Sequence, residues 1–130
     1  MNAALEFHDS EVSSVEGTGS KLCVRFSAAY VHHSDGLPGK DAGTGYVQTL
    51  EFVFYEAQWS GNLGMCLGSL WKGQVRQGER TMSLVPLPYR SIEPIEGEFE
   101  FENGEHLSVR AASAVIRLTG EPRFVERYAC

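Results

Sequence analysis

The segment IEGEFEFENGEHLSVRA, residues 95–111, carries the strongest structural signal in this chain of 130 residues. Its apolar residues alternate with glutamates, and a period of two is typical of a strand with one buried and one solvated face. Residues 102–104 are predicted to form a three-residue hairpin loop in which Gly104 takes the left-handed conformation. A two-residue Asn-Gly turn would instead set Phe101 against His106, an apolar residue against a polar one.

The three-residue loop also sets the register of the two strands that flank it. The predicted pairs are Phe99 with Leu107, Gly97 with Val109, Glu100 with His106 and Glu96 with Arg110. The last two pairs join opposite charges across neighbouring strands, which contributes roughly 0.2–1 kcal/mol per pair. We therefore interpret the row of glutamates as a solvated face that its neighbour strand partly neutralises, and not as a cation site.

The same alternation extends outward along the chain in both directions. After the hairpin, the buried parity slips by one residue near 112–113, which predicts either a bulge or a strand that passes from one sheet to another. Pro86 and Pro88 either end the ladder pairing or confine the stretch around them to a sheet edge. No window shows a helical apolar stripe, so we expect at most one short helical turn. About eight to nine strands then predict an all-β fold, an antiparallel two-sheet sandwich, with a closed or flattened β-barrel as the alternative.

Size and charge limit the classes of function. With 130 residues, 42% hydrophobic and 22% charged, the chain suits a single folded β domain over residues 1–130. A net charge of −6 without a basic patch argues against nucleic-acid binding. No apolar run approaches the roughly 18 residues that span a membrane, and the first residues do not resemble a signal peptide. A cytoplasmic location is the resulting expectation.

The three cysteines, Cys23, Cys66 and Cys130, are far apart in the sequence. An odd number without CxxC spacing favours neither a disulfide framework nor a thiolate zinc site. We expect free thiols, and no cofactor or metal.

Four residues are candidates for binding, and three of them lie together at His32, His33 and Asp35. Adjacent side chains on a strand point to opposite faces, so the two histidines cannot share one ion while the strand stays regular. His32 follows the inward parity of Tyr30, and His33 the outward parity. The glycine and lysine spacing of the loop from residue 34 to 46 does not match a phosphate-binding loop. Because loops of this length in small domains are often functional or disordered, it is predicted to be disordered or to contact a partner.

His8 is the fourth candidate, and with Asp9 and Ser10 it supplies the residue types of a catalytic triad. Neighbours in sequence do not converge as a triad must, and no GxSxG turn is present. We interpret Asp9 and Ser10 as a strand end with a turn, and predict no catalytic residue.

The motif LEFHDSEVSSV, residues 5–15, with the following strand KLCVRF, resembles the start of small bacterial β-rich domains. These begin with Phe-His-Asp and a small residue, and some are similar to immunity proteins that neutralise the toxins of neighbouring cells. An acidic β domain with a long exposed loop and no convergent catalytic group predicts a non-enzymatic, immunity-like domain that acts by contact with a protein partner. Exposed edge strands also favour self-association into a homo-oligomer. The alternatives are a small-molecule-binding sandwich or barrel with weak enzymatic activity and, third, a metal enzyme.

Overall fold

The computed structural model describes residues 1–129, and Cys130 lies outside the described residues. Twelve strands within these described residues pair antiparallel in one sheet, which confirms the all-β prediction. Within the described residues there is no α-helix, and the one helical segment is the 3-10 turn η1 (Leu63–Met65). The strands are β1 (Asn2–Thr18), β2 (Lys21–Ser34), β3 (Gly43–Tyr55), β4 (Gln58–Ser60), β5 (Gly68–Gln77), β6 (Arg80–Met82), β7 (Leu84–Leu87), β8 (Arg90–Ser91), β9 (Ile95–Phe101), β10 (His106–Ala111), β11 (Ser113–Leu118) and β12 (Arg123–Tyr128).

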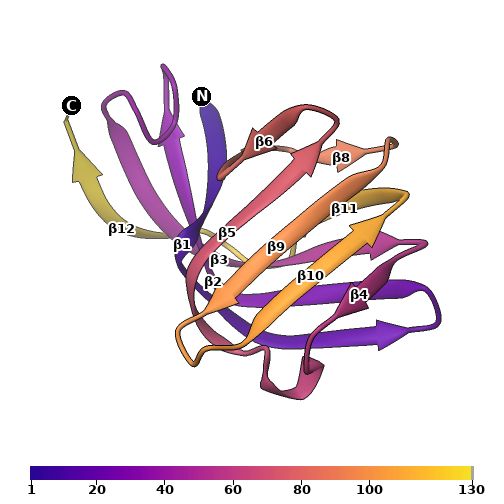
Figure 1. Ribbon diagram of the computed structural model, residues 1–130. Helices are drawn as coiled ribbons and strands as arrows, with labels where there is room; N and C mark the ends of the chain where they lie inside the picture. The colour runs from indigo at the N-terminus through magenta and orange to yellow at the C-terminus, as the bar shows by residue number, and fades with distance from the viewer. Residues whose placement is uncertain (130) are drawn as a thin grey trace.

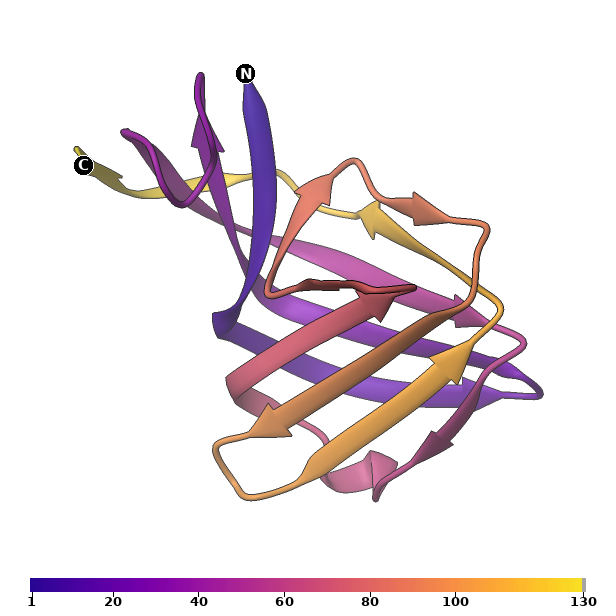
Figure 2. The same ribbon diagram turned by 45° about the horizontal axis from the view of Figure 1, so that its top comes forward.

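The sheet curls into a half-barrel, so that β5, β9 and β10 face β1, β2 and β3 across the core (Figures 1 and 2). The strand order is β4-β10-β9-β5-β1-β2-β3-β11-β8, with β6 on β5, β7 on β1 and β12 on β3. Because β1 pairs with both β2 and β5, the predicted division into two sheets is not confirmed. The predicted number of strands was too low, because strands of two or three residues show no alternation.

The hairpin of β9 and β10 has the predicted register at all four pairs. Its loop is closed by hydrogen bonds from Gly104 N to the Phe101 carbonyl (3.0 Å) and from Phe101 N to the Glu105 carbonyl (2.9 Å). Gly104 has φ 91°, the left-handed conformation that the prediction required. At the predicted parity slip, the chain crosses from one half of the curled sheet to the other. β10 pairs with β9 and β4, whereas β11 pairs with β3 and β8.

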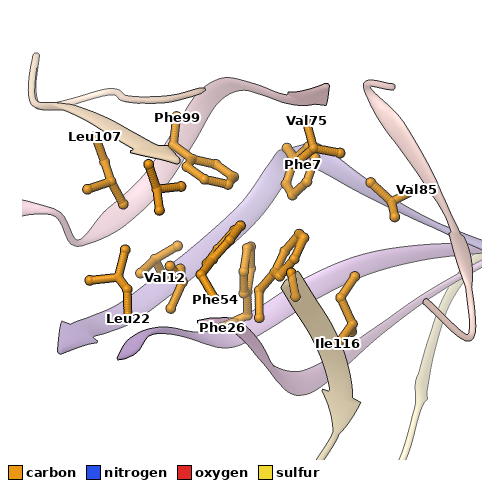
Figure 3. Packing of buried hydrophobic residues seen from close by; sticks show 14 of the residues in the cluster. Phe7, Val12, Leu22, Phe26, Phe54, Val75, Val85, Phe99, Leu107 and Ile116 are labelled. Carbon is orange, nitrogen blue, oxygen red and sulfur yellow. The ribbon is translucent and has the colours of Figure 1, made fainter. Parts of the chain in front are cut away.

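Aromatic rings from both halves of the curl fill the core (Figure 3). Phe99 from β9 lies edge-on to Phe7 from β1, with ring centroids 5.3 Å apart, and edge-on to Phe54 from β3 at 6.5 Å. Phe52 and Phe54 stack at 4.5 Å. Each of these four side chains is at least 99% buried, so their packing holds the two halves together.

β1 bends sharply at His8-Asp9-Ser10. Its pairing with β2 jumps from Glu6–Tyr30 to Glu11–Ala28, and Asp9 has φ 72°. Ser10 is fully buried, and its hydroxyl donates to the Glu6 carbonyl and accepts from Tyr30 N (2.9 Å). The prediction of a strand end at Asp9 and Ser10 was wrong, because this side chain replaces the missing backbone hydrogen bonds and lets the strand continue.

Beyond the bend, part of the sheet projects from the half-barrel (Figures 1 and 2). We call it the arm: residues 2–6 of β1, 29–34 of β2 and 43–48 of β3, with β12 on the far side of β3 and β7 on the far side of β1. A second register shift, between Phe26 and Ala29, exchanges the faces of β2. Ala29 now joins the core, so Tyr30 and His32 lie on the outer face of the arm and His33 on its inner face. His32 and His33 lie on opposite faces as predicted, and His32 is the more buried of the two at 9% exposed, but the face that buries it is the one opposite the core.

The predicted loop at 34–46 is shorter than expected, and side-chain hydrogen bonds hold its backbone in place. β2 runs to Ser34 and β3 begins at Gly43, so only residues 35–42 connect them. Asp41 accepts a hydrogen bond from Leu37 N (2.6 Å), and Ser34 donates to the Ala42 carbonyl (2.7 Å). The glycine-rich end of the segment is strand: a Cβ at Gly43 would meet the His33 backbone carbonyl, and a Cβ at Gly45 would meet the Tyr30 side chain.

Candidate functional site

The outer face of the arm carries a network of polar side chains drawn from β1, β2 and β12. His32 Nε2 lies 3.2 Å from Glu6 Oε1, and His32 Nδ1 forms a hydrogen bond with the Tyr128 hydroxyl. The Tyr30 hydroxyl donates to Glu126 Oε1 (2.8 Å). We call these five residues the clamp, because two of them belong to β12 and the other three belong to the strands on the opposite side of β3.

Gly45 is the reason that the clamp can reach across β3. Tyr30 on β2 passes over this glycine to Glu126 on β12. A Cβ added at Gly45 would lie 2.6 Å from Tyr30 Cζ and still closer to its hydroxyl oxygen. Only glycine leaves this space, so a residue that the sequence placed in a flexible loop has a packing role within a strand.

The contacts of the clamp link β12 to β1 and β2. Both nitrogens of the buried His32 ring have partners inside the protein. Burial, together with the hydrogen bond and the charge of Glu126, raises the pKa of Tyr30, which therefore stays a proton donor. Within the described residues no buried polar side-chain atom lacks a partner. Each of the five clamp side chains contacts another member of the clamp.

The inner face of the arm carries a row of aromatic rings. His33 packs on Tyr46 with ring centroids 4.5 Å apart, and Tyr46 lies edge-on to Phe124 of β12 at 5.9 Å. Burial lowers the pKa of His33, and the nearby N-terminal charge lowers it further. At the end of the row, Phe124 is 58% exposed, and the next residue, Val125, is 45% exposed.

The other two predicted site residues lie elsewhere. His8 sits at the bend of β1, where its Nδ1 forms a 2.8 Å hydrogen bond with the Trp71 carbonyl. This bond and the Asp9 carboxylate raise the pKa of His8. Asp35 is exposed in the connection from β2 to β3.

The four predicted residues therefore do not form one site. In the part of the chain that the structure describes, no hydrogen bond, ion pair or ring contact joins any two of His8, His32, His33 and Asp35. Over the same residues, no group of three or more His, Cys, Asp or Glu side chains is placed to hold a metal ion.

The sequence alone did not identify the partners of Tyr30 and His32. Glu6 shows a usable signal, since it is the polar residue between Leu5 and Phe7 and so lies on the face opposite the core. Glu126 and Tyr128 show none, because they lie 96 residues beyond Tyr30 and His32.

No family model, curated protein or solved structure matched this chain. Among residues 1–129 there is also no helix long and apolar enough to cross a membrane.

Proposed function

We propose that this chain is a protein-contact domain that binds a partner chain along the outer edge of β12. The observation that carries the proposal is that β12 pairs only with β3 among the described residues, while it exposes Phe124 and Val125. An edge strand with an open row of N–H and C=O groups is a template for one more strand. Exposed apolar side chains on that strand add contact area.

Two further features support this role. The clamp ties β12 to the strands beyond β3, so the edge is held in a fixed conformation and a partner pays little ordering entropy on binding. The aromatic row from His33 through Tyr46 to Phe124 gives the same region a second apolar surface. The N-terminal resemblance to immunity-like domains agrees with contact as the activity, and a second copy of the chain or an unlike protein would serve as partner.

Phe124→Glu tests the proposal, because it places a charge on the exposed strand. The matched control is Ile92→Glu, at an apolar residue that is 86% exposed next to β8. We would measure the mass of each protein by light scattering over a range of concentrations, and use each as bait in bacterial lysate. We expect a dimer or a captured partner with the wild type and with Ile92→Glu, and neither with Phe124→Glu. A wild-type protein that stays monomeric and captures nothing, or an unaffected Phe124→Glu, contradicts the proposal.

Ligand binding inside the fold has less support. The interior is filled by phenylalanine rings, and the ring-to-ring contacts run from one half of the curl to the other. A small-molecule site is better sought on the surface.

A further inference from the structure

A groove of about 670 Å³ lies along the edge of the arm opposite to β12. β7, the first residues of β1 and the connection between β2 and β3 form its walls. Its apolar lining includes Leu37, Leu84 and Leu87, with proline rings at Pro38, Pro86 and Pro88. Leu37 is 63% exposed, so the groove presents apolar surface to solvent.

Contacts among β1, β7 and the connection from β2 to β3 hold the walls of the groove in position. Pro86 lies in β7, which pairs only with β1 among the described residues, as the sequence predicted for an edge. Gly39 has φ 85°, and a Cβ there would come within 2.9 Å of Leu84 Cδ1, so the connection rests directly on β7. Asn2 donates to the Gly36 carbonyl (2.8 Å) and ties the same connection to β1.

The charged residues of the groove are all positive. Lys40 and Arg80 line it, and no carboxylate among the described residues does so. Neither cation belongs to an ion pair within residues 1–129, although the chain has a net charge of −6. Two unpaired cations beside an apolar wall, on an otherwise acidic protein, fit a ligand with an anionic head and an apolar body.

We propose that this groove binds a small amphipathic anion, a carboxylate that carries an acyl or aromatic body. The body lies against Leu37, Leu84 and Leu87, and the acid group lies at Lys40 and Arg80. The groove volume falls within the range of about 300–1,000 Å³ that is usual for small-ligand sites. This site is separate from the β12 edge, because β1, β2 and β3 lie between them.

Decanoate is a suitable probe, titrated below its micelle concentration and followed by amide chemical shifts of the ¹⁵N-labelled full chain. We expect saturable shifts that map to residues 36–40 and 84–87. Decanol and decyltrimethylammonium have the same apolar body without the anion, and we expect weaker binding of decanol and none of the cation. Lys40→Glu and Arg80→Glu should each weaken decanoate binding by roughly two- to tenfold, the range for reversing one exposed charge.

Lys21→Glu is the matched control, since Lys21 is exposed, lies at the start of β2 and lines no part of the groove. It should leave decanoate binding unchanged. The proposal is overturned if decanoate gives no saturable shifts, if decanol binds equally well, or if the shifts map to β12. It is also overturned if all three charge reversals have the same effect, or if shifts occur only with vesicles of anionic lipid. Loss of the β12 contact in Phe124→Glu would leave decanoate binding intact, so the two proposals fail separately.

Discussion

Gly45→Ala should destabilise the arm, because the added methyl group occupies the space of the Tyr30 ring. The ring cannot move aside freely, since Tyr30 is 9% exposed and its hydroxyl is bonded to Glu126. Forcing a group into a packed site costs about 1–3 kcal/mol. With a typical urea m value of about 2 kcal/mol/M, the unfolding midpoint should fall by roughly 0.5–1.5 M.

Two comparisons separate this clash from a general effect of alanine. Gly64→Ala should leave the midpoint unchanged, because a Cβ there meets only Asn62 Oδ1, at 3.6 Å. Tyr30→Leu lacks the ring atoms that clash, so adding Gly45→Ala to it should be neutral, or stabilising by up to about 1 kcal/mol as expected for glycine replaced in a strand. An equal loss of stability in the two backgrounds would refute the reasoning, and so would a Gly45→Ala protein as stable as the wild type.

Two further outcomes are expected. Ser10→Ala removes the acceptor of the buried Tyr30 N–H and should lower the free energy of unfolding in urea by about 1–3 kcal/mol. Ser13→Ala, at an exposed serine, should change the free energy of unfolding by no more than about 0.5 kcal/mol. Similar values for both variants would show that Ser10 does not stabilise the bend. In an NMR titration His8 should have a pKa above its ordinary 6.5 and His33 one below it, and the reverse order would contradict the described contacts. His8 then adds stability below pH 6.5 that is lost as pH rises through its folded pKa, while His33 lowers stability as pH falls below 6.5.

The parts of the fold that sequence predicted are those set by neighbouring residues. The register of β9 and β10 follows from one three-residue loop and the alternation on both sides of it. The parity slip at 112–113 was visible because a period of two continues on each side. The two register shifts at the bend were not visible, because Ser10 acts on Tyr30 from another strand, and Ala28 and Ala29 suit either face equally well.

In the candidate site, too, relations between nearby residues could be predicted from the sequence and relations between distant ones could not. The common face of Tyr30 and His32 was predicted correctly, because two residues apart on a strand is a local relation. Both side chains are buried, but outside the main core cluster, because the shift between Phe26 and Ala29 reverses the faces of the strand before they are reached. Their partner strand β12 is supplied from the far end of the chain, and the polar side chains of that strand carried no signal of a shared site.

The position of β3 has a consequence for how the protein is made. Two of its neighbours, β11 and β12, are synthesised only after all the other strands have left the ribosome. Until then, the β3 edge that includes Leu50, Phe52 and Phe54 has no strand beside it, and these side chains are among the most hydrophobic in the protein. A nascent chain that stalls before residue 113 would therefore expose a strongly aggregating edge, which makes β3 the segment expected to require a chaperone during translation.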